Sequence, residues 1–238
     1  MDELSKLRAR LHPALSASGN SSFLLALEAA THPETERLER LVSDLAQSKE
    51  PSPLLIDFVQ EVLIKGKEPK SACNILLRHP RTNDLAYARE LFGAADAARN
   101  SDLMRSAAAN WYRLAPRNLS AAQNYCALLA MFDEQPELSL SLASECLDAT
   151  PRSVPAKINH AAALINNRKF KIADAMLSAI DEAALGPYER THFNFLKLKS
   201  TLNAGRGDAA NLAQRIDAND LYPEQLLWLE KHGVTLSR

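Results

Sequence analysis

Five prolines recur along this chain at nearly equal intervals. They are Pro80, Pro116, Pro151, Pro187 and Pro223, and their successive spacings are 36, 35, 36 and 36 residues. A period of this length is typical of solenoids built from repeated helical hairpins. Each proline follows a segment with a helical pattern of apolar residues, and proline cannot continue a helix because it has no amide hydrogen. The prolines therefore predict the ends of successive helix pairs.

Within each period, apolar residues are spaced as on one face of a helix, and a break falls near the middle. In the third period, the two predicted helices flank residues 166–169, and their apolar stripes are Ile158, Ala161, Leu164 and Ile165, then Phe170, Ala173, Leu177 and Ile180. Trp111 and Leu177 lie on such stripes, so we expect both to be buried between stacked helices. The same reasoning predicts breaks near Arg99, Pro116, Asp133, Pro151, Asn167, Pro187, Gly205 and Pro223.

The composition agrees with an all-α fold. Alanine and leucine make up about a third of the chain, far above ordinary usage, and there are only 7 glycines. This mixture favours helix over strand. The formal net charge is -1, which differs from the strong positive charge of a typical nucleic-acid-binding chain.

The segment from about residue 85 to residue 223 resembles tandem tetratricopeptide repeats. The third period carries the closest match, because its small, aromatic and packing residues occur where the family has them: Ala161, Leu164, Phe170, Ala173 and Leu177. Residues 111–118 also resemble the helix-to-repeat junction common in bacterial members. The sequence departs from the family where Gln123 or Lys157 replaces its first-helix tryptophan, and where alanine replaces its usual glycine. The resemblance implies a right-handed α-solenoid of divergent helix hairpins.

We expect three regions along the chain. Residues 1–80 form an N-terminal helical region, with helices expected at 23–30, 34–46, 53–64 and 69–78 and hinges at 16–22 and 47–52. This region either continues the solenoid as degenerate helix pairs or forms a separate helical cap. Residues 81–222 hold the tetratricopeptide-like repeats, and residues 223–238 form a capping helix and tail.

The sequence contains none of the usual signatures of catalysis or cofactor binding. It has no phosphate-binding glycine loop, zinc-protease motif or nucleophile elbow, and Gly205 and Gly207 lie at an expected turn. The three cysteines, Cys73, Cys126 and Cys146, are odd in number and widely spaced, which favours buried, reduced thiols. We therefore expect no enzyme activity, no cofactor and no metal site.

Three asparagines are the candidate ligand contacts. Asn124, Asn159 and Asn194 are separated by 35 and 35 residues, and each lies early in the first helix of its period. In tetratricopeptide arrays the first helices line the concave face, and an amide both donates to and accepts from a peptide backbone. The three side chains are expected to point into that groove together. A basic excess in the third and fourth periods, which includes Lys197 and Lys199, would favour an acidic peptide.

These observations predict a non-catalytic scaffold or adaptor that binds a protein or peptide in its concave groove. One alternative is the helical interaction region of a larger enzyme or membrane-anchored protein. A second is a pentatricopeptide-like array that binds nucleic acid, which the near-neutral charge disfavours. No apolar run is long enough to span a membrane and the N-terminus has no signal-peptide pattern, so we expect a cytoplasmic protein without membrane insertion.

Overall fold

The computed structural model describes residues 40, 42–43, 45, 52–65, 68–205 and 209–236, and within these ranges every regular element is a helix. The expectation of an all-α chain is therefore confirmed for this part of the protein. The chain divides by packing into two compact units, Met1–Met104 and Arg105–Arg238. The region boundaries expected after residues 80 and 222 were placed by the sequence repeat and not by packing. The expected helix at 23–30, most of that at 34–46, the expected hinge at 16–22 and all but residue 52 of that at 47–52 lie outside the described residues.

In the part of unit 1 that the structure describes, three long helices pack on one another. They are α4 (Pro53–Lys65), α5 (Pro69–Arg78) and α6 (Leu85–Ala97), close to the helices expected from the sequence. Proline occupies the first turn of α5, where its missing amide hydrogen costs nothing. Asp84 caps α6 by accepting hydrogen bonds from the amides of Ala86 and Tyr87. Helix α7 (Ser101–Leu114) runs across the boundary between the units.

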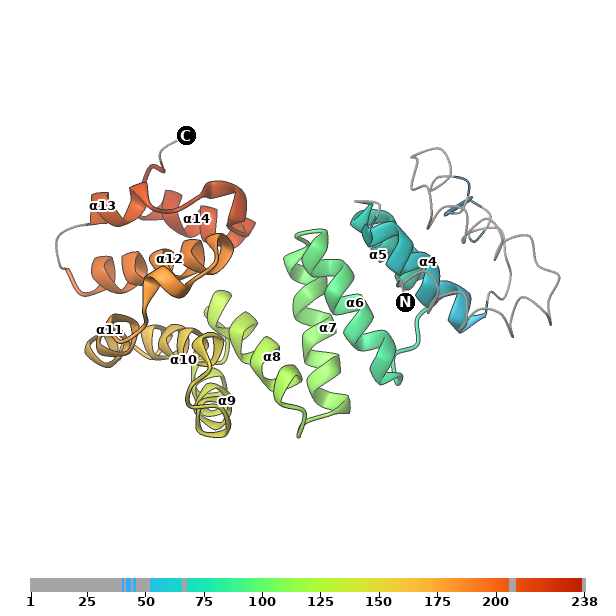
Figure 1. Ribbon diagram of the computed structural model, residues 1–238, viewed down its shortest axis with the longest axis horizontal. Helices are drawn as coiled ribbons and strands as arrows, with labels where there is room; N and C mark the ends of the chain where they lie inside the picture. The colour runs from blue at the N-terminus through green and yellow to red at the C-terminus, as the bar shows by residue number, and fades with distance from the viewer. Residues whose placement is uncertain are drawn as a thin grey trace. The chain divides into compact units, whose positions relative to one another are not determined.

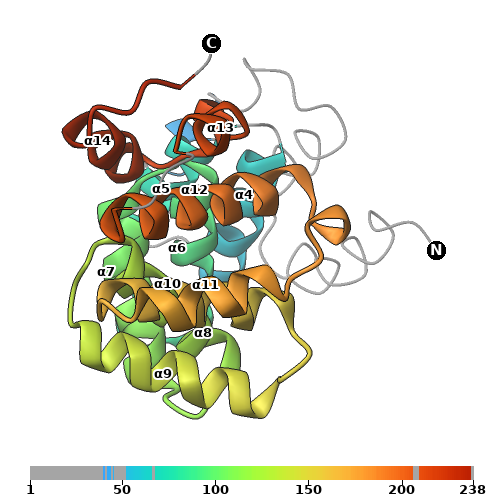
Figure 2. The same ribbon diagram turned by 90° about the vertical axis from the view of Figure 1, so that its left-hand side faces the viewer.

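Unit 2 contains helices that pack in consecutive pairs along the chain (Figure 1). The pairs are α8 (Leu119–Met131) with α9 (Pro136–Ala149), α10 (Val154–Asn166) with α11 (Phe170–Ser178), and α12 (Pro187–Asn203) with α13 (Ala209–Gln214). Helix α14 (Pro223–Lys231) follows the last pair. Each first helix also contacts the next first helix, because α10 packs on both α8 and α12. Figure 2 shows α10 between α9 and α12.

Three hydrophobic cores follow one another through unit 2. The first joins α8 and α9 to Ala163 of α10, the second joins α10 and α11 to Phe193 of α12, and the third joins Phe195 of α12 to α13 and α14. Helices α10 and α12 therefore each contribute to two adjacent cores. Leu177 is buried in the second core and Trp111 is also buried, as their positions on the stripes predict.

The turn after α6 and the turns after α8, α10 and α12 share one backbone feature. A residue with positive φ lies two positions after the end of each of these helices: Arg99, Asp133, Arg168 and Gly205. After the first three of these residues, the next amide donates back to a carbonyl five residues earlier, as in Asn100 to Ala95, Glu134 to Leu129 and Lys169 to Leu164. The breaks expected near these four positions are therefore confirmed. The breaks expected near Pro187 and Pro223 are also present, and each of these prolines begins the helix that follows the break.

None of the described helices combines the length and apolar character needed to cross a membrane.

Candidate ligand-binding groove

A groove of about 330 Å³ lies along the first helices of unit 2. Helices α8, α10 and α12 form its walls, and Gln225 of α14 reaches its edge. Most of the lining is apolar, namely Ala127, Ala130, Met131, Pro155, Ile158, Ala162, Tyr188, Phe195 and Leu196. The small alanine side chains leave the groove open, because a larger side chain at these positions would fill it. A groove of this size holds one or two side chains of a ligand.

The groove's lysine is neutralised inside the protein. Lys199 is only 6% exposed, and its Nζ donates to Asp133 Oδ1 at 2.8 Å and to Asn166 Oδ1 at 3.0 Å. The Asn166 amide is itself held, because its Nδ2 donates to the Ala130 carbonyl at 2.5 Å. Sequence reasoning assigned Lys199 to an exposed basic face that favours acidic peptides. Its charge is instead balanced by Asp133, from the acidic second period.

The other titratable groups at the groove carry no unbalanced positive charge. Gln225 Nε2 lies 3.2 Å from His192 Nδ1. Because an amide nitrogen only donates, the His192 ring accepts at Nδ1 and is the neutral tautomer with its proton on Nε2. Glu189 accepts a hydrogen bond from the Gly186 amide at 3.0 Å, which caps the start of α12. The helix N-terminus there favours the carboxylate charge.

The structure places the three predicted asparagines in different surroundings. Asn159 lines the groove, and its Nδ2 donates to the Gln123 carbonyl at 3.3 Å. Asn124 is half-buried on α8 and is not among the groove residues. Asn194 is fully buried, and neither its Nδ2 nor its Oδ1 has a hydrogen-bond partner among the described residues. It lies two residues beyond His192, which places it on the opposite side of α12 from the groove. Of the three, the structure brings only Asn159 to the groove.

Although the three asparagines are equally spaced in the sequence, the turn residues are not, because the fourth period is longer. The left-handed turn residues Asp133 and Arg168 are 35 apart, whereas Arg168 and Gly205 are 37 apart. The structural counterpart of Asn159 on α12 is therefore Leu196, which does line the groove, and not Asn194. Helix α12 is 17 residues long where α8 and α10 are 13, and this longer helix accounts for the shift.

Two asparagines of α10 link it to the preceding first helix, α8. Asn159 donates to Gln123, and Asn166 donates to Ala130, so each amide binds a carbonyl 36 residues earlier on the preceding first helix. Helix carbonyls already accept one bond within the helix, and each has a second lone pair for such a contact. These links fix the register of α10 on α8 and so shape one wall of the groove.

The link made by Asn159 predicts a stability difference within the asparagine series. Asn159→Ala should lower the free energy of unfolding by about 1 kcal/mol, because it removes one side-chain hydrogen bond to a carbonyl. Asn124→Ala is the matched control and should change stability by less than about 0.5 kcal/mol. Urea denaturation of the two variants measures both values. Equal values for the two variants would show that the Asn159 link contributes nothing.

The cysteines are free and buried, as the sequence predicts. A hydrogen bond with Cys146 and burial raise the pKa of the Cys126 thiol well above its ordinary value, which keeps it protonated. The described residues hold no cluster of three or more histidine, cysteine or acidic side chains suited to a metal ion.

Comparison with models of known protein families and with curated proteins found no match.

Proposed function

We propose that this chain is a non-catalytic scaffold that binds a protein or peptide in the groove of unit 2, on a tetratricopeptide-like, right-handed solenoid. The observation that carries this proposal is the groove itself, which runs along the first helices α8, α10 and α12. First helices line the ligand-binding face in the family that the sequence resembles. Asn159 is the one residue of the predicted series that remains a candidate contact.

The charges around the groove favour an uncharged anchor in the ligand. Lys199 is paired with Asp133, His192 is neutral by its hydrogen bond, and Glu189 caps a helix. A ligand carboxylate entering the groove would lose its hydration without gaining a free positive charge, and a ligand cation would meet only Glu189, whose carboxylate already accepts the Gly186 amide. An aliphatic or aromatic side chain gains from burial against Ile158, Phe195 and Leu196. The ligand we propose is therefore a peptide segment with an uncharged apolar residue at its centre.

The balance of charges at the groove also disfavours the alternative of a pentatricopeptide-like array that binds nucleic acid. Phosphate binding needs lysine or arginine side chains that are free to release counterions. Lys199 is the only lysine or arginine among the described groove residues, and it is already neutralised.

A photo-crosslinking experiment tests whether ligands enter through the groove. Tyr188 is 41% exposed at the groove, and Ile172 is 55% exposed on α11, away from it. We would replace each, in separate proteins, with p-benzoylphenylalanine and irradiate them with cell extract. The proposal predicts that a defined partner crosslinks from position 188 and not from position 172. Partners that crosslink equally from both positions, or only from position 172, would contradict it.

A further inference from the structure

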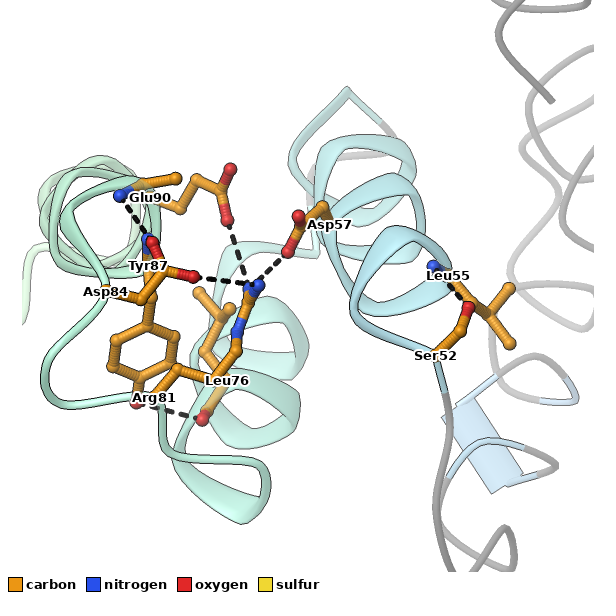
Figure 3. A network of polar contacts seen from close by, with 9 residues as sticks. Ser52, Leu55, Asp57, Leu76, Arg81, Asp84, Tyr87 and Glu90 are labelled. Carbon is orange, nitrogen blue, oxygen red and sulfur yellow. Dashed lines mark hydrogen bonds and ion pairs between the residues drawn. The ribbon is translucent and has the colours of Figure 1, made fainter. Parts of the chain in front are cut away.

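Unit 1 contains a cluster of charged side chains around one arginine. Arg81, in the loop between α5 and α6, contacts Asp57 of α4, lies 3.3 Å from Asp84 and lies 3.6 Å from Glu90 of α6 (Figure 3). Its guanidinium also lies over the Tyr87 ring, 5.5 Å from the centroid. The Tyr87 hydroxyl donates to the Leu76 carbonyl of α5 at 3.0 Å. The Arg81 cluster therefore joins helices α4, α5 and α6.

The cluster has more negative than positive charge. Three carboxylates surround one guanidinium, so ionisation of all three would leave two charges uncompensated at the centre, apart from Arg89, which acts on Glu90 from its own helix. The Glu90 side chain is 19% exposed, and its buried Oε2 accepts no hydrogen bond from the described residues. Glu90 is therefore the carboxyl least able to hold a negative charge.

The environment of Glu90 shifts its titration into the neutral range. Burial raises the pKa of Glu90 to about 7, and the charge of Asp57 and a hydrogen bond with Asp57 act in the same direction. Arg81 and Arg89 oppose the shift without cancelling it. At acidic pH the protonated Glu90 is neutral, so it does not repel Asp57. Above neutral pH the two carboxylates repel each other across the contact between α4 and α6.

We propose that the Arg81 cluster is a proton-dependent clamp that holds α4 on α6 while Glu90 is protonated and loosens when Glu90 ionises. Glutamate in an unfolded chain titrates near 4.5, so the folded state binds this proton more tightly. The stabilisation by the proton is complete below about pH 4.5 and is lost as pH rises through about 7. Helix α4 is therefore held more tightly on α6 below neutral pH than above it.

Carboxyl carbon NMR of the wild-type chain tests the clamp directly. The side-chain carboxyl of Glu90 should titrate with a midpoint near 7, and Asp57→Asn should lower that midpoint because it removes the repelling partner. A Glu90 midpoint below about 5 in the wild type would overturn the proposal, and this measurement needs no variant to fold.

Hydrogen exchange tests whether α4 loosens from α6 when Glu90 ionises. After correction for intrinsic rates, protection of the buried α4 amides, such as those of Val59 and Leu63, should fall on the order of a hundredfold between about pH 5 and about pH 8.5. Glu90→Gln should remove most of this pH dependence. Glu68→Gln, at the start of α5 where the side chain makes no capping bond, should retain it. Identical pH profiles for wild type and Glu90→Gln would overturn the clamp.

Discussion

Phe193→Ala should lower the free energy of unfolding of unit 2 by about 3 to 5 kcal/mol. Phe193 is completely buried, and it is the α12 side chain in the core formed with α10 and α11. Removing its ring leaves a cavity at the junction between two repeats, and the packed helices on either side cannot close it fully. The junction depends on this core, so the loss should exceed that of any single polar change described above.

Tryptophan fluorescence during urea denaturation is suited to this measurement. Both tryptophans, Trp111 and Trp228, belong to unit 2, so the signal reports that unit alone. Leu227→Ala is the matched control, because Leu227 is 63% exposed on α14 and its loss should cost less than about 0.5 kcal/mol. A cost below about 1 kcal/mol for Phe193→Ala would mean that adjacent repeats do not share the core described here.

Ala162→Phe should reduce ligand affinity at least about tenfold, which corresponds to about 1.4 kcal/mol. Ala162 is a half-buried residue of α10 in the groove wall, and a phenyl ring there would occupy space that the ligand's apolar side chain needs. Ala175→Phe provides the control, because Ala175 is exposed on α11, outside the groove. Isothermal calorimetry with one ligand and both variants gives the two affinities.

The result would be informative only if the folds are intact, so circular dichroism spectra of the two variants should match that of the wild type. Equal affinity of Ala162→Phe and Ala175→Phe for the same ligand would exclude the groove as its binding site.

The helix pairs of unit 2 could be predicted from the sequence because they depend on local chemistry. Proline spacing and apolar stripes are visible in the sequence, and the turns at Asp133, Arg168 and Gly205 follow from where the stripes break. The repeated left-handed residue was not predictable, because only Gly205 is a glycine. Aspartate is enriched at positive φ only relative to other non-glycine residues, and arginine is not enriched there, so these positions give a weak signal.

The groove chemistry was harder to predict because it depends on contacts between periods. Lys199 looks like a surface lysine in the sequence, and only folding brings it to Asp133, 66 residues earlier. Asn194 looked equivalent to Asn159 by spacing, but the longer α12 rotates it away from the groove. A comparison of turn positions in place of residue spacing would have identified Leu196 as the counterpart of Asn159.

The central claim is that the groove selects a peptide segment with an uncharged apolar anchor. The most direct test is selection of a phage-displayed library of random peptides against the full chain, followed by counter-selection against Ala162→Phe. We predict enriched peptides that share an aliphatic or aromatic residue, lose binding to Ala162→Phe and retain binding to Ala175→Phe. Enriched peptides whose shared residue is charged, or peptides that bind Ala162→Phe as tightly as the wild type, would contradict it.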